Sequence, residues 1–139
     1  MISWESSTFI ARPADDVFAY VADVRNDPSW HKDVRNATIV DGETVGLGTV
    51  FDLDARVSGT EEIIEFEAPT RVVLLASMGK MTPRDIRTVT PAEGGVTFTR
   101  RVEMEASGVM GWMSKKMVGT ARKRNDQFVA NLKYVLEGS

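Results

Sequence analysis

Apolar and polar residues alternate along seven stretches of the chain, and a two-residue period is typical of β-strands with one buried face. Near the N-terminus, for example, Ile2, Trp4 and Ile10 fall on the same side. Turn signals such as Gly94-Gly95 separate the later stretches. The pattern predicts strands over residues 2–10, 33–40, 49–57, 60–67, 71–78, 82–90 and 96–105. Because the later connections are short, neighbouring strands should be antiparallel.

A helical period replaces the alternation in other parts of the chain. Pro13 suits the first turn of a helix, and Asp15 and Asp16 favour its N-terminus, so residues 14–23 should form a short helix. A second short helix is expected over residues 28–32. The proline-free segment 109–136 has apolar residues at spacings of three, four or seven, which predicts a long amphipathic helix. Its apolar stripe consists of Met110, Met113, Met117, Ala121, Phe128, Leu132 and Val135.

These elements predict an α+β fold. A seven-stranded sheet with one apolar face needs a cover, and only the last helix is long enough to provide it. We therefore expect a curved antiparallel sheet wrapped around a long C-terminal helix, with two short helices between strands 1 and 2. The 139 residues suit a single domain over 1–139.

Composition narrows the class of protein. The chain has no cysteine, which excludes disulfides, thiolate metal sites and cysteine nucleophiles. No apolar run approaches the roughly 20 residues that span a bilayer, so no transmembrane segment is expected. The first eight residues do not have the pattern of a signal peptide. We therefore expect a cytoplasmic protein.

The charge of the chain bears on its partners. A formal net charge of -3 argues against a nucleic-acid partner. Basic residues nevertheless outnumber acidic ones in the last predicted helix. They indicate either a solvated outer helix face or a surface that binds an anionic partner.

Several turn and packing motifs carry a family resemblance. They are Ile10-Ala11-Arg12-Pro13, Asp16-Val17-Phe18-Ala19-Tyr20-Val21-Ala22-Asp23, Pro28-Ser29-Trp30, Gly46-Leu47-Gly48-Thr49 and Glu67-Ala68-Pro69-Thr70-Arg71. With these motifs the chain resembles the polyketide cyclase/dehydrase-like proteins of the SRPBCC superfamily, which includes START domains and birch-pollen allergens. The resemblance extends over nearly the whole chain and implies the helix-grip fold.

The resemblance also implies an apolar cavity between the sheet and the last helix. Proteins of this superfamily bind lipids, polyketides or aromatic metabolites, and some are cyclases or dehydratases. The residues expected to contact such a ligand are Trp4, Trp30, Phe51, Leu53, Phe66, Leu74, Ala76, Ile86, Phe98, Arg100, Met113, Met117 and Phe128. Methionine suits this role because its flexible side chain adapts to irregular apolar shapes.

The only histidine of the chain, His31, follows Trp30. His31 is either a general base at the cavity mouth or a surface residue on a short helix. Trp30 is either a packing residue for the short helices or part of the cavity wall. Tyr20, on the first predicted helix, is a further candidate for catalysis.

Two arginines lie on the same side of their predicted strands as apolar residues. Arg84 shares a side with Ile86, and Arg100 shares a side with Phe98. Strict alternation points both guanidinium groups toward the helix, where each needs a partner. That partner is either a protein carboxylate or the acid group of a ligand, and both arginines are also catalytic candidates.

Glutamates cluster in the predicted strand over residues 60–67. They are expected on its solvated outer face, because alternation would turn Ile64 and Phe66 inward. With one histidine and no cysteine, no metal site is expected, and no cofactor motif is present.

Three functions are compatible with these residues. The first is the binding of a hydrophobic small molecule. The second is a cyclase or dehydratase that acts by positioning a reactive chain. The third is a protein-interaction module of the chaperone-cofactor type, which requires a filled cavity and a large exposed apolar patch. The protein is expected to be a monomer or a homodimer.

Overall fold

A computed structural model describes residues 1–105 and 115–138. In chain order its elements are β1 (Ile2–Ile10), α1 (Ala14–Ala22), the 3₁₀ helix η1 (Val24–Ser29), β2 (Val34–Ile39), β3 (Val50–Ala55), β4 (Gly59–Glu67), β5 (Arg71–Ser77), β6 (Arg84–Ala92), β7 (Gly95–Met104) and α2 (Lys115–Glu137). All seven predicted strands are present, with bounds within two residues of the predicted ones. Residues 109–114 of the predicted long helix lie outside the described residues.

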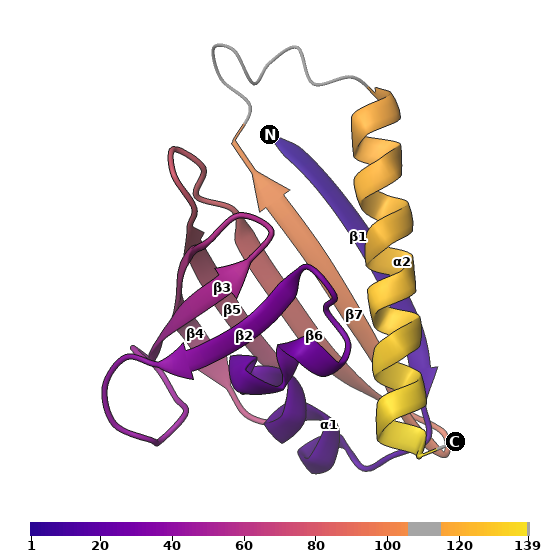
Figure 1. Cartoon of the computed structure of the whole chain (residues 1–139). Coiled ribbons are helices and arrows are strands. Elements are labelled where there is room, and N and C mark those ends of the chain that lie inside the picture. The colour runs from indigo at the N-terminus through magenta and orange to yellow at the C-terminus, as the bar shows by residue number, and fades with distance from the viewer. Residues whose placement is uncertain (106–114, 139) are drawn as a thin grey trace.

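The strands form one antiparallel sheet in the order β1-β7-β6-β5-β4-β3-β2. β1 pairs with β7 along its whole length, from Ile2 opposite Met104 to Ile10 opposite Val96. β1 and β2 therefore lie at opposite edges of the sheet, and α1 and η1 connect them. Figure 1 shows the sheet curving around the inner side of α2, which runs alongside β1 and β7 and packs mostly against β1. This arrangement confirms the predicted fold class.

The two short helices differ slightly from the prediction. α1 begins after Pro13 and buries Val17, Phe18 and Val21. The second helix was expected over residues 28–32, but η1 begins at Val24 and ends before Trp30. The reason is the Asp23 side chain, which caps the start of η1 by accepting a hydrogen bond from the backbone N–H of Arg25 at 3.1 Å.

A β-bulge interrupts β4. Its pairing with β5 shifts between Ile63 and Glu65, so the alternation of faces is reset within the strand. Before the bulge Glu61 and Ile63 are buried, whereas Phe66 contacts the core after it. The prediction that the glutamates of this strand all lie on the solvated face is therefore wrong for Glu61, because it assumed one uninterrupted alternation.

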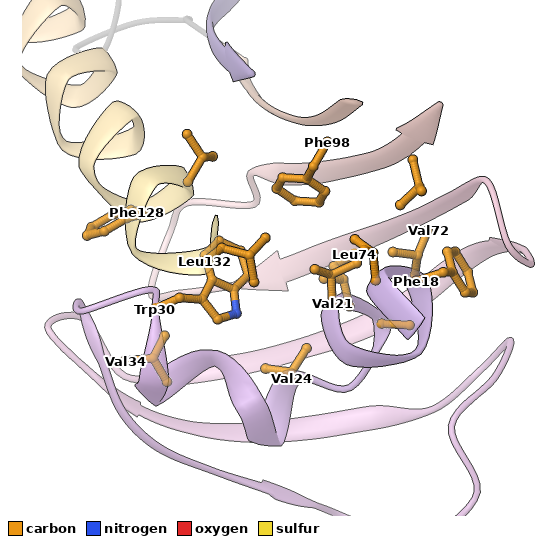
Figure 2. Packing of buried hydrophobic residues seen from close by; sticks show 14 of the residues in the cluster. Phe18, Val21, Val24, Trp30, Val34, Val72, Leu74, Phe98, Phe128 and Leu132 are labelled. Atoms are coloured by element: carbon orange, nitrogen blue, oxygen red, sulfur yellow. The ribbon is translucent and has the colours of Figure 1, made fainter. Parts of the chain in front are cut away.

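The hydrophobic core fills one end of the space between the sheet and the helices. Trp30, Phe98 and Leu132 are fully buried there, and the Trp30 and Phe98 rings meet edge to face with centroids 6.0 Å apart. Figure 2 shows Trp30 among residues of α1, η1, the sheet and α2. The core thus joins the three layers at one end and leaves the other end for a cavity.

Candidate ligand-binding site

A pocket of about 350 Å³ lies between the inner face of the sheet and α2. Its apolar wall consists of Trp4, Val34, Leu53, Ala55, Val57, Ala76, Met78, Pro83, Val102, Met104, Met117, Ala121 and Phe128. Its polar groups are His31, Asp33, Arg56, Glu61, Asp85, Arg100, Thr120 and Arg124. The pocket therefore combines a large apolar wall with a small set of polar side chains, which is typical of small-molecule sites.

The pairing register of the strands brings together the residues that form the floor of this pocket. Glu61 on β4 lies opposite Ala76 on β5, and Val102 on β7 lies between Asp85 on β6 and Trp4 on β1. Inward-facing residues of neighbouring strands thus form a row across the sheet. Because Ala76 is small, the space above the middle of this row stays open.

A buried charge network lies beside the pocket floor. Arg87 is completely buried, and its guanidinium donates two hydrogen bonds to Asp27 of η1, at 2.7 and 3.0 Å. It also donates to Asp85 at 2.9 Å and to the Val21 carbonyl at 2.8 Å. Its carbon Cζ lies 4.8 Å from the centre of the Trp30 ring. Arg87 therefore ties both short helices to β6.

Arg100 extends the network to the pocket and to α2. It donates to Asp85 through Nε, at 3.1 Å, and through Nη2, at 2.9 Å. Nη1 donates to Asn125 Oδ1 at 2.8 Å, and Nη2 lies 3.0 Å from His31 Nε2. Burial opposes the ionisation of Asp85, but the Arg100 and Arg87 guanidiniums hold the pKa of this carboxyl below its ordinary value. The partner of the inward Arg100 is thus a protein carboxylate.

His31 stacks on Phe128 of α2, with ring centroids 4.5 Å apart. Burial lowers the pKa of His31 well below its ordinary value, and the positive charge of Arg100 lowers it further, while Asp85 opposes both. The ring is therefore neutral at neutral pH. Since Arg100 can only donate, His31 Nε2 accepts, and the proton is on Nδ1. Within the described residues, Nδ1 has no hydrogen-bond partner.

Among the described residues, the Glu61 carboxyl is a second polar group of the pocket without a hydrogen-bond partner, after His31 Nδ1. Glu61 is only 6% exposed, and no hydrogen bond or ion pair joins its carboxyl to any residue that the structure describes. Burial raises the pKa of Glu61 to about 8, and the negative charge of Asp85 adds to this effect, while Arg87 opposes it. At neutral pH the carboxyl is therefore mostly protonated and can donate a hydrogen bond.

The pocket brings together some of the residues predicted to contact a ligand. Trp4, Leu53, Ala76, Arg100, Met117 and Phe128 line it, as does His31. These residues come from β1, β3, β5, β7, α2 and the segment after η1. Their meeting depends on the sheet curving back toward the last helix. Met113 lies outside the described residues.

Other predicted site residues lie elsewhere. Trp30, Phe51, Leu74 and Phe98 are in the hydrophobic core, and Phe66 packs against it. Tyr20 shares a hydrogen bond with Ser29, with the two oxygens 2.6 Å apart, and is also outside the pocket wall. These side chains belong to the hydrophobic core or pack against it, and they do not line the pocket.

The prediction that Arg84 points toward the helix is wrong, and so is the inward orientation of Ile86. Both residues line a shallow hollow on the outer face of the sheet. In β6 the inward residues are Asp85, Arg87 and Val89. The strand has this orientation because Arg87 and Asp85 then find buried partners, whereas an apolar residue such as Ile86 tolerates the half-buried outer face.

Sequence reasoning did not identify Asp27, Glu61, Asp85, Arg87 or Asn125 as site residues. β6 was one available signal, because it carries charged residues on both faces. Whichever face of this strand turns inward, at least one charged side chain is buried. Asn125 was a second signal, because it occupies a position between Ala121 and Phe128 on the apolar stripe of α2. A polar residue in such a stripe indicates a buried partner.

The described residues contain neither a metal-ligand cluster nor a membrane-spanning helix. Over residues 1–105 and 115–138, no group of three or more histidine or acidic side chains is placed to hold a metal ion. In the same part of the chain, no helix has both the length and the apolar character needed to cross a membrane.

A curved antiparallel sheet that holds a long C-terminal helix over a pocket defines the helix-grip class of proteins. The chain belongs to the family described as polyketide cyclase / dehydrase and lipid transport, which matches residues 1–137. This family membership confirms the SRPBCC resemblance inferred from the sequence motifs.

Solved structures share this fold. The KanY protein has 20% identity and a TM-score of 0.74, and the match covers 99% of this chain and 98% of that one. Ara h 8.0201 has 14% identity and a TM-score of 0.74, with the same coverage. The Aha1 dimer from Colwellia psychrerythraea has 10% identity and a TM-score of 0.73, covering 99% and 97%. Identities this low show the fold alone. No curated protein matches the sequence.

Proposed function

We propose that this protein binds a hydrophobic small molecule in the pocket between the sheet and α2. The observation that carries the proposal is the pocket itself, with its volume of about 350 Å³ and its wall of aliphatic, methionine and aromatic side chains. Burying the apolar surface of a ligand there stabilises the complex by about 25 cal/mol per Å². Trp4, Leu53, Met117 and Phe128 supply the contacts.

The family description supports the class of ligand. It includes both polyketide conversion and lipid transport, whose molecules share extended apolar surfaces. A lipid, a polyketide or an aromatic metabolite therefore fits the proposal. The cytoplasmic location and the monomeric or homodimeric state inferred from the sequence stay predictions.

A cyclase or dehydratase activity is the second candidate, and one observation favours it. His31 Nδ1 and the Glu61 carboxyl both lack a hydrogen-bond partner in the described part of the chain, and both residues line the same pocket. Two such groups in one pocket can orient a carbonyl-rich chain and exchange protons with it. Arg100, being bound to Asp85 and Asn125, would act by holding His31 in place.

Binding is tested with N-phenyl-1-naphthylamine, a neutral apolar molecule whose fluorescence rises when it enters an apolar cavity. We expect saturable binding of one molecule per chain. Replacing Ala76 on the pocket floor by phenylalanine should abolish this binding, because the new ring occupies the cavity. Ala121→Phe, on the helix side of the same pocket, serves as a second filling variant.

Ala130→Phe is the matched control, because Ala130 lies on the exposed side of α2 and does not line the pocket. It should bind the dye as the wild type does. Native mass spectrometry of freshly purified protein would in addition reveal a ligand carried through purification. If the dye does not bind, or if both filling variants fold and still bind it with unchanged affinity, the proposal is wrong.

A further inference from the structure

Glu61 differs from the other buried charged residues around the pocket. Asp27, Asp85, Arg87 and Arg100 form ion pairs with one another, whereas the Glu61 carboxyl has no hydrogen-bond or ion-pair partner in the described part of the chain. Its residue is only 6% exposed and its side chain lines the pocket. A buried polar group without a partner is costly, so a ligand that supplies the partner gains affinity.

The charge balance of the pocket floor limits what that ligand can be. Arg87 is paired with Asp27 and Asp85, and Arg100 is paired with Asp85, so two positive charges face two negative ones. Four of the five polar hydrogens of Arg100 are directed at Asp85, Asn125 and His31. No buried guanidinium among these residues is therefore left to neutralise an anionic ligand.

We infer that the ligand carries an uncharged oxygen acceptor, such as a ketone, and that the Glu61 carboxyl donates a hydrogen bond to it inside the pocket. This inference rests on the proposed function and specifies its ligand class. A neutral ketone needs no counter-ion, whereas a carboxylate of the same shape beside Glu61 would lose its hydration next to buried guanidiniums that are already paired, because Arg56, which also lines the pocket, is exposed. The site should therefore discriminate between molecules of equal shape by their charge.

Because Glu61 can lose its proton, the affinity for a ketone should depend on pH. The groups that face Glu61 or share its pocket are Asp27, Asp85, Arg87, Arg100, His31, Asp33, Arg56 and Arg124. Asp85 has a pKa below its ordinary value and His31 is neutral, so neither changes charge above pH 7. Since the pKa of Glu61 is raised to about 8, its donor is present below that pH and is lost above it. Affinity for a ketone should fall as the pH passes through this value.

The test uses three aromatic molecules of nearly equal shape. They are 2-acetylnaphthalene, a ketone; 2-naphthoate, its anionic counterpart; and 2-ethylnaphthalene, which has no polar group. Each competes with N-phenyl-1-naphthylamine for the wild-type protein at pH 6.5. We expect the ketone to bind about five-fold more tightly than the hydrocarbon, as one hydrogen bond implies. The anion should bind at least about ten-fold more weakly than the ketone, because its charge is desolvated without compensation.

Two variants assign the effect to Glu61. Glu61→Leu should bind the ketone and the hydrocarbon equally, because it has no donor. Glu61→Gln keeps a donor of similar size, so it should retain the preference for the ketone at pH 6.5 and at pH 9.5, whereas the wild type loses it at pH 9.5. Glu62→Gln, on the exposed face of the same strand, is the matched control and should behave as the wild type.

Binding of the dye tests the pocket, whereas the choice between ketone and anion tests the role of Glu61. If the dye binds but the wild type takes the anion as tightly as the ketone, the inference is wrong and the proposed function stands. The inference also fails if Glu61→Gln and Glu61→Leu discriminate among the three molecules in the same way. If neither the dye nor any competitor binds, the proposed function fails, and the inference fails with it.

Discussion

Arg100 on β7 and Asn125 on α2 hold each other by two hydrogen bonds. Nη1 of Arg100 donates to Oδ1 of Asn125 at 2.8 Å, and Nδ2 of Asn125 donates to the Arg100 carbonyl oxygen at 3.0 Å. Asn125 is almost completely buried, although it lies on the apolar stripe of α2. The pair therefore sets the position of the helix over the sheet and, through Arg100, that of His31 beside the pocket.

Replacing Asn125 by alanine should destabilise the protein by about 2 to 3 kcal/mol, because both bonds are lost and a buried guanidinium N–H is left without a partner. Urea unfolding followed by circular dichroism measures this change. Gln127→Ala on the same helix is the matched control, since Gln127 is exposed and its side chain bonds, among the described residues, to the Asn131 side chain alone. Gln127→Ala should lower the free energy of unfolding by less than about 0.5 kcal/mol. Equal costs for the two variants would contradict a structural role for Asn125.

The fully buried pair of Arg87 and Asp27 should be more important for stability than any ion pair on the surface. Arg87→Met leaves Asp27 buried without its partner, and we expect a loss of about 3 to 5 kcal/mol in the free energy of unfolding. Adding Asp27→Asn to this variant should restore part of the loss, because the uncompensated charge is removed.

The surface pair of Arg71 and Glu65 provides the comparison. Its atoms Nε and Oε1 are 3.6 Å apart and both side chains are more than a third exposed, so Arg71→Met should cost less than about 1 kcal/mol. A loss of similar size in Arg71→Met and Arg87→Met would show that the buried network does not stabilise the fold.

His31 should not titrate in the folded protein over the range in which histidine ordinarily does. Its lowered pKa, caused by burial and by the charge of Arg100, keeps the ring neutral. Because it is the only histidine, a one-dimensional NMR spectrum follows it directly. We expect its ring proton shifts to stay constant from pH 8 to pH 5.5, whereas the protein unfolded in urea should titrate near its ordinary value of about 6.5.

The lowered pKa of His31 should make the stability of the fold depend on pH. Below about pH 6.5 the unfolded chain binds a proton at His31 that the folded protein does not, so stability should fall as the pH decreases through this value. His31→Gln should reduce that decrease. A native titration midpoint near 6.5 would show that the ring is accessible to water and not held between Arg100 and Phe128.

Local patterns in the sequence were sufficient for the elements and their order. Alternation over residues 2–10 and 96–105 predicted both strands and their inward faces, because a strand buried on one side repeats every two residues. Pro13 and the acidic residues after it predicted the start of α1. The family motifs then predicted the helix-grip arrangement, which the strand order confirms.

The polar part of the site depends on distant contacts that no local pattern contains. β6 carries charged residues on both faces, and alternation alone does not decide whether Arg84 or Arg87 faces inward. That choice is decided by Asp27, which lies sixty positions away in the chain and pairs with Arg87 in the folded protein. The inward position of Glu61 likewise depends on the bulge in β4, whose register is fixed by pairing with β5.

The sequence by itself thus determined the seven strands, the covering helix and the apolar character of the space between them. Only the tertiary structure decided which charged residues line that space. The physical reason is that apolar burial follows a short repeat along the chain, while a buried charge is tolerated only where folding brings a partner to it.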